Sequence, residues 1–170
     1  MQAFVNTNDI EGRRDKLGRV DEAVAWLRRH GLLDASATLS DTDYLWLLDV
    51  REALRALALA NNGVPLEDGA LAVVDDAAAR TLTVRLTPTG AVMQPAATGT
   101  TRAVGSLLAI VVEAMHEGTW PRMKACRRDV CRWLFYDSSK NRASSWCSMA
   151  VCGNRVKTRE YRRRRKGARP

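Results

Sequence analysis

A chain of 170 residues is long enough for one sizeable domain with a small appendage, and too short for two domains of typical size. Its net charge of +8 is unevenly spread, because residues 1–121 hold 11 basic and 16 acidic side chains whereas residues 122–170 hold 16 basic and 3 acidic ones. This asymmetry excludes a uniformly basic protein and predicts a mildly acidic globular domain followed by a segment that meets polyanions.

The first 79 residues carry the apolar spacing of helices. After an extended start over residues 3–8, an amphipathic helix is predicted over residues 15–30, with a glycine as its C-cap. A longer helix is capped by Ser40 or Asp41 and ends in Asn-Asn-Gly. A short alanine-rich helix then runs over residues 68–79.

The apolar period changes to two after this point. Alternating side chains over residues 80–86, a Pro-Thr-Gly turn and residues 91–94 predict one small β-hairpin. Helical spacing returns over residues 101–116 and breaks at residues 118–121, where the charge balance reverses. We therefore place a domain boundary after Pro121.

The predicted fold class is mainly α, of the α+β type. A helical N-terminal domain with one small β-hairpin spans residues 1–121, and a small C-terminal module spans residues 122–170. Residues 1–10 lack the pattern of a secretory signal, and the longest aliphatic run, over residues 107–112, is too short to cross a bilayer. We expect a cytoplasmic protein with no membrane partner.

All four cysteines fall in the C-terminal module, as Cys126-x4-Cys131 and Cys147-x4-Cys152. A reducing compartment disfavours disulfides, and two close thiol pairs joined by a loop suit the two opposite edges of a tetrahedral ion. Because four thiolates leave no open coordination position, we expect a structural Zn²⁺. The module has too few large apolar side chains to fold unaided, which also favours a metal. A thiol redox switch is the alternative.

Several motifs of the module resemble the CGNR zinc finger family: Leu134-Phe135-Tyr136-Asp137, Trp146-Cys147-Ser148-Met149 and above all Cys152-Gly153-Asn154-Arg155. Upstream, Phe4-Val5-Asn6-Thr7 and Arg51-Glu52-Ala53-Leu54-Arg55 resemble the ABATE domain, which precedes this finger in proteins described as stress-induced transcriptional regulators. The resemblance implies a bacterial-type regulator whose N-terminal domain senses a ligand or forms a homodimer.

A basic helix is predicted to follow the last cysteine, over residues 154–166. Lys and Arg side chains neutralise phosphates, and Asn and Arg can also pair with base edges, so DNA is the expected partner. The candidate nucleic-acid contacts are Lys140, Asn141, Arg142, Asn154, Arg155, Lys157, Arg159, Arg162, Arg163 and Arg165.

Other roles are open for some of these residues. Asn154 could hold a left-handed turn or hydrogen-bond a cysteine sulfur, and Arg155 could pair with Asp137 instead of a phosphate. Trp133, Phe135 and Trp146 are expected to pack in the small core rather than stack on bases.

The N-terminal domain shows no nucleophile, base and orienting group, which argues against an enzyme. Asn6 and Thr7 are candidate polar groups of a small-molecule effector pocket, with capping or turn formation as the alternative. The function predicted is therefore a DNA-binding transcriptional regulator. The alternatives are a zinc-dependent protein-interaction module that engages an acidic partner, and an RNA-binding protein.

Overall fold

The computed structural model describes residues 1–66, 68–96 and 98–167, and its helices surround the long helix α3 (Asp41–Ala60). As predicted, α3 begins at Ser40, whose hydroxyl oxygen accepts a hydrogen bond from the backbone N–H of Asp43 at 3.1 Å. Helices α4 (Asp68–Thr81) and α5 (Gly99–His116) pack against α3. The three predicted helices of this region are confirmed.

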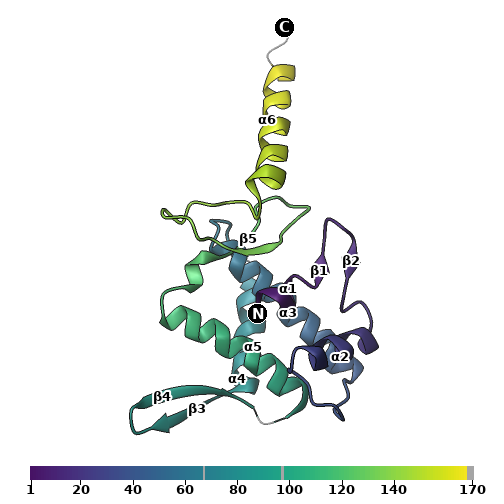
Figure 1. The fold of residues 1–170 in the computed structure, drawn as a ribbon, viewed down its shortest axis with the longest axis vertical. Coiled ribbons are helices and arrows are strands. Elements are labelled where there is room, and N and C mark those ends of the chain that lie inside the picture. The colour runs from purple at the N-terminus through teal and green to yellow at the C-terminus, as the bar shows by residue number, and fades with distance from the viewer. Residues whose placement is uncertain (67, 97, 168–170) are drawn as a thin grey trace.

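The predicted hairpin is confirmed as the antiparallel strands β3 (Leu82–Thr87) and β4 (Gly90–Pro95), which extend beyond α4 and α5 (Figure 1). The fold is mainly helical, with two-stranded sheets only among the described residues, so the predicted fold class is confirmed. A second two-stranded sheet, β1 (Asn8–Asp9) with β2 (Arg14–Asp15), was not predicted.

The N-terminal segment corrects two expectations. Residues 3–8 are not extended: helix α1 (Gln2–Val5) forms there and places Phe4 and Val5 in the core. The next helix, α2 (Val20–Arg29), begins at residue 20 and not at residue 15. Residues 14 and 15 belong to β2, and the Asp15 carboxylate accepts a hydrogen bond from the backbone N–H of Leu17 at 2.9 Å, which turns the chain before α2.

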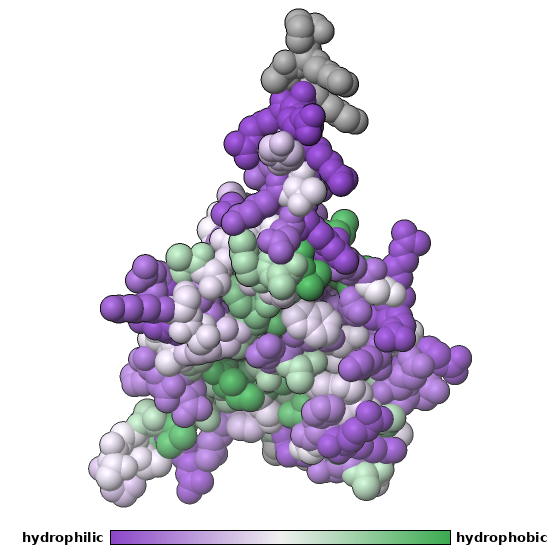
Figure 2. All heavy atoms as spheres, turned by 45° about the horizontal axis from the view of Figure 1, so that its top comes forward, coloured by the Kyte–Doolittle hydropathy of each residue, from purple (hydrophilic) through white to green (hydrophobic). Residues whose placement is uncertain are grey.

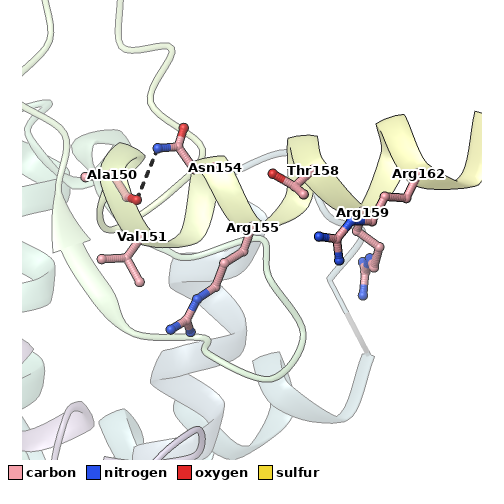
Figure 3. Close-up of a pocket in the computed structure, with 7 residues that line it drawn as sticks. All are labelled: Ala150, Val151, Asn154, Arg155, Thr158, Arg159 and Arg162. Atoms are coloured by element: carbon pink, nitrogen blue, oxygen red, sulfur yellow. Dashed lines mark hydrogen bonds between the residues drawn. The ribbon is translucent and has the colours of Figure 1, made fainter.

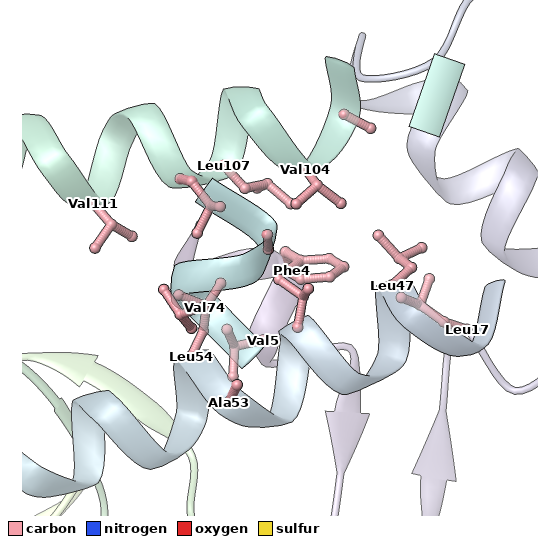
Figure 4. Packing of buried hydrophobic residues seen from close by; sticks show 14 of the residues in the cluster. Phe4, Val5, Leu17, Leu47, Ala53, Leu54, Val74, Val104, Leu107 and Val111 are labelled. Carbon is pink, nitrogen blue, oxygen red and sulfur yellow. The ribbon is translucent and has the colours of Figure 1, made fainter. Parts of the chain in front are cut away.

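The main hydrophobic core lies between α1, α3, α4 and α5 (Figure 4). Phe4 is at its centre, with Leu47 and Leu54 of α3 on one side and Val104 and Leu107 of α5 on the other. Each such side chain contributes about 1.5–3 kcal/mol through burial. This core fixes the N-terminal helices as one body.

The C-terminal module continues from this core. It comprises the short helix η1 (Trp120–Arg122), strands β5 (Met123–Ala125) and β6 (Leu134–Tyr136), the π-helical turn η2 (Met149–Gly153) and helix α6 (Asn154–Gly167). Ala125 and Leu134 are fully buried in the same cluster as the N-terminal helices. The predicted boundary after Pro121 is therefore crossed by a shared core, and the division into two domains stays a prediction.

Asparagine side chains reinforce this junction. At the end of α3, the amide of Asn61 donates to the carbonyl oxygens of Trp120 and Met123, both at 2.9 Å. The amide of Asn62 donates to the carbonyl oxygens of Ala125 at 2.8 Å and Ser145 at 3.0 Å. The Asn-Asn-Gly sequence that ends α3 thus also anchors the C-terminal module.

Helix α6 leaves the module and projects away from the body (Figure 1), and its surface is hydrophilic along the visible length (Figure 2). Across the described residues, every helix is too short or too polar to traverse a bilayer.

Candidate metal centre and basic helix

The four cysteine sulfurs meet in one cluster, with all Sγ atoms within 4.8 Å of one another. The Sγ atoms of Cys131 and Cys147 are 3.7 Å apart, as are those of Cys147 and Cys152. A tetrahedral zinc with Zn–S bonds of about 2.3 Å requires sulfurs about 3.8 Å apart. The donor set and its spacing therefore fit a tetrahedral thiolate-bound ion, held by Cys126, Cys131, Cys147 and Cys152.

Backbone hydrogen bonds and a short turn position Cys126 and Cys152 at the cluster. Cys126 follows β5, and its backbone N–H donates to the carbonyl oxygen of Trp133 at 2.9 Å. Cys152 lies in η2, which begins at Ser148, whose hydroxyl oxygen accepts a hydrogen bond from the N–H of Val151. Trp133 and Trp146 pack against the cysteines, which confirms their predicted packing role, whereas Phe135 is half-buried and does not belong to this cluster. A small apolar shell therefore shields the cluster.

The pKa values of the thiols in the cluster are displaced in opposite directions. The pKa of Cys126 is lowered to about 5, first because the Cys131 thiol donates a hydrogen bond to it. The pKa of Cys147 is raised to about 12, first by burial and then by the Cys126 thiolate. One thiolate is favoured and the next is opposed by its charge, and a bound divalent cation would remove this opposition.

Gly153 leaves room for the side chains of Met149 and Trp146 beside its backbone. A Cβ atom at this position would lie 2.4 Å from the Met149 sulfur and 3.1 Å from the Trp146 ring. Such distances are well inside van der Waals contact, so a side chain here would push Met149 or Trp146 away. This close approach gives the glycine of the Cys-Gly-Asn-Arg sequence a packing reason.

A buried ion pair supports the loop between β6 and η2. The Lys124 ammonium donates to the Asp137 carboxylate at 2.8 Å, and the two side chains are only 6% and 0% exposed. Asp137 also accepts from Ser139 and from the backbone N–H of Ser144. Burial alone would raise the pKa of Asp137, but the Lys124 and serine hydrogen bonds outweigh it and lower the pKa below its usual range.

This pairing excludes the alternative in which Arg155 pairs with Asp137. Asp137 is enclosed by Lys124 and the serines, whereas Arg155 pairs with Glu11 of the β1–β2 loop. Arg128, also bound to Glu11, donates a longer hydrogen bond to the Cys152 sulfur at 3.6 Å. Sequence reasoning missed Glu11, Lys124 and Arg128, since only the fold brings them to their partners.

Asn154 has neither of the two non-DNA roles predicted for it. Its backbone is right-handed helical, with φ −66° and ψ −38°, so it does not hold a left-handed turn. Its amide donates to the carbonyl oxygen of Ala150 at 3.2 Å and not to a sulfur (Figure 3). The side chain is exposed at the start of α6.

Two buried arginines join the N-terminal segment to α3 and to the module. Arg51 forms two 2.8 Å hydrogen bonds with the Asp15 carboxylate. Arg55 donates to the carbonyl oxygens of Val5 at 2.7 Å and Arg132 at 2.9 Å. The Arg-Glu-Ala-Leu-Arg motif of α3 is therefore structural, and its second arginine contacts the loop that carries Cys131.

Asn6 and Thr7, the candidate pocket residues, are both buried and engaged by the protein. The Asn6 amide donates to the Leu134 carbonyl at 2.9 Å and accepts from its N–H at 2.8 Å, in the manner of a strand partner. The Thr7 hydroxyl donates to the Phe4 carbonyl at 2.6 Å. Asn6 also lines an open hollow beside Trp26 and Trp133. A ligand role for Asn6 and Thr7 stays a prediction.

Every predicted nucleic-acid contact is exposed. Seven of them lie on α6: Asn154, Arg155, Lys157, Arg159, Arg162, Arg163 and Arg165. Lys140, Asn141 and Arg142 lie apart from the helix, on the loop between β6 and η2. Arg142 has a positive φ of 50°, and its carbonyl oxygen accepts a 2.5 Å hydrogen bond from Lys124.

Comparison with known families agrees with this geometry. Residues 1–117 match the ABATE family, described as "Putative stress-induced transcription regulator", and residues 122–165 match the family described as "CGNR zinc finger". Both families are of regulator or zinc-finger type and neither is an enzyme family. A comparison with curated proteins gave no match. The chain belongs to the ABATE family and carries a CGNR zinc finger, a metal-binding module, over residues 122–165.

Proposed function

We propose that this regulator binds duplex DNA through α6, with a structural Zn²⁺ at the four cysteines. The observation that carries the proposal is the high positive charge and the exposure of α6. Of its 14 residues, eight are Lys or Arg and only Glu160 is acidic. The helix extends from the body, and among the described residues its one ion pair to another element is that of Arg155 (Figure 1).

Such a helix is poorly stabilised on its own. Arg155, Arg159 and Arg163 are spaced four residues apart, and like charges at this spacing destabilise a helix by about 0.2–0.5 kcal/mol per pair. Helix α6 has no apolar stripe to offset this repulsion by packing. A polyanion would neutralise these arginines and remove the repulsion between them. The helix therefore favours a polyanionic partner, such as DNA.

The dimensions of α6 suit the major groove of B-DNA. Fourteen helical residues span about 21 Å, and the groove, about 12 Å wide, admits one α-helix. The major groove of an RNA duplex is too narrow for side chains to read, so this geometry favours DNA over double-stranded RNA.

One face of α6 carries groups suited to base edges. A shallow hollow runs along residues 150–162 and is lined by an amide, a hydroxyl and methyl groups, together with arginines (Figure 3). We propose that Asn154 and Thr158 approach base edges from this face, and that Arg159, Arg162 and Arg163 of α6 bind the flanking phosphates. The Asn154 amide must then leave the Ala150 carbonyl.

The metal fixes where this helix begins. Cys152 lies two residues before Asn154, so an ion bound to its sulfur would hold the first turn of α6 on the module. Its proposed role is structural, since four thiolates fill a tetrahedral site. The N-terminal domain supplies the regulatory part, as an effector-binding or dimerising unit, and this assignment rests on the family description.

The test is fluorescence anisotropy with labelled duplex DNA at several salt concentrations, on the zinc-loaded full chain. We expect log K to fall with log salt at about −0.9 per phosphate contact, and R159Q/R163Q to reduce that slope by about 1.8. The control R80Q/R85Q removes two arginines of α4 and β3, which lie at the opposite end of the molecule from α6 (Figure 1). A wild-type chain without salt-dependent duplex binding, or an R159Q/R163Q variant equal to wild type, would refute the proposal.

A further inference from the structure

The loop between β1 and β2 reaches from the N-terminal domain to the base of α6. Its Glu11 carboxylate accepts two hydrogen bonds from the Arg128 guanidinium, at 2.7 and 2.8 Å, and a further one from Arg155. Arg155 belongs to the first turn of α6, and Arg128 contacts the Cys152 sulfur. This loop is therefore held against the root of the basic helix.

Arg13 of the same loop and Arg14, the first residue of β2, carry charges that no ion pair neutralises within the described residues. Arg13 and Arg14 are exposed, and neither has an ion-pair partner within residues 1–66, 68–96 and 98–167. The acidic groups nearby are engaged elsewhere: Glu11 by Arg128 and Arg155, and Asp15 by Arg51. Asp9 lies opposite Arg14 in the strand register, and its carboxylate accepts the N–H of Gly12 at 2.9 Å.

The backbone conformation of Arg13 adds to this argument. Its φ is +52°, in the left-handed region, which costs an ordinary side chain about 1–2 kcal/mol and which Gly or Asn adopts more readily. The turn alone would thus favour another residue type. Arg132 and Arg142 share this conformation, so at Arg13 it is the combination with an exposed charge that points to a function for the side chain.

We propose that Arg13 and Arg14 form a second phosphate-contacting element beside α6, so that the N-terminal domain itself contributes to the DNA interface. This inference rests on the proposed DNA binding. Glu11 is the positioning residue, because it binds the loop to Arg128 and Arg155 at the base of the helix. The partner contacted is the phosphate backbone, since a guanidinium on an exposed turn supplies charge and two parallel donors.

The test compares duplex binding of the zinc-loaded full chain with that of R13Q/R14Q. Two lost phosphate contacts should reduce the salt slope by about 1.8, and affinity at 0.1 M salt should fall roughly 60-fold. The matched control is R28Q/R29Q, another adjacent arginine pair of the same domain, at the end of α2. Both doubles remove the same charge, so a general charge effect would weaken them equally.

A single variant, R13N, separates a role in binding from one in the turn. Asparagine tolerates a left-handed backbone better than arginine, so R13N should be at least as stable as wild type, yet bind DNA about eightfold more weakly at 0.1 M salt. If R13Q/R14Q and R13N keep the wild-type slope of log K against log salt while R159Q/R163Q has a reduced slope, this inference is wrong and the proposed function stands. If the wild-type chain does not bind duplex DNA, the proposed function fails and the inference fails with it.

Discussion

Replacing Asp137 by asparagine would exchange one carboxylate oxygen for an NH₂ group at the base of the β6–η2 loop. One carboxylate oxygen accepts from the N–H and hydroxyl of Ser139, and the other from the Lys124 ammonium and the N–H of Ser144. Whichever way the new amide turns, its NH₂ group faces a donor N–H. Lys124 also loses its counter-ion while only 6% exposed.

Removing one partner of a buried ion pair costs about 3–5 kcal/mol, and we expect D137N to destabilise the protein by this amount. The control D129N breaks an ion pair in the same module by the same substitution, between Asp129 and Arg132. The Asp129 side chain is 79% exposed, so its loss should cost about 1 kcal/mol or less. The two variants differ in burial and not in chemistry.

The assay is urea unfolding of the zinc-loaded chains at pH 7, followed by circular dichroism. With an m value of about 2 kcal/mol/M, D137N should lower the urea midpoint by about 1.5–2.5 M. The folded-state pKa of Asp137 is depressed, so its stabilisation is complete above the unfolded pKa of about 3.9 and is lost as the pH falls through the folded value. The difference in unfolding free energy between D137N and the wild-type chain should therefore become smaller below about pH 4. If D137N costs no more than D129N at pH 7, the ion pair does not support the module as argued.

Three further predictions follow from the same contacts. G153A should destabilise the zinc-loaded chain by about 1–3 kcal/mol in urea, since its Cβ meets Met149 and Trp146, whereas G69A, with open space around it, should be neutral or stabilising; equal effects would contradict this. R55K should cost about 2–3 kcal/mol because one ammonium cannot reach both the Val5 and Arg132 carbonyls, whereas R80K, at an exposed pair with Asp76, should stay within about 0.5 kcal/mol. Elemental analysis should find one zinc per wild-type chain and none in C131S. Removing the metal with a chelator should raise amide hydrogen exchange over residues 126–153, while α3 keeps its protection. A module that stays ordered without metal would refute the structural role of the ion.

Much of the fold follows from local patterns. Ser40, the apolar spacing of α3 and α5 and the alternation in β3 predicted elements that the structure contains, because these patterns act over a few residues. Local patterns did not predict the helix at the N-terminus. Residues 2–5 form a helix whose Phe4 and Val5 are buried by α3 and α5, and four residues carry no period that could predict such a partner.

The candidate site divides in the same way. The cysteine spacing and the arginine run determined by themselves that a tetrahedral thiolate cluster and an exposed basic helix should adjoin, because ligand geometry and charge density are local properties of the sequence. Only the tertiary structure decided the partners of Asp137 and Arg155. A buried carboxylate takes whichever cation the fold delivers, and here strand pairing brought Lys124 to Asp137 and left Arg155 to Glu11, 144 residues away in the chain.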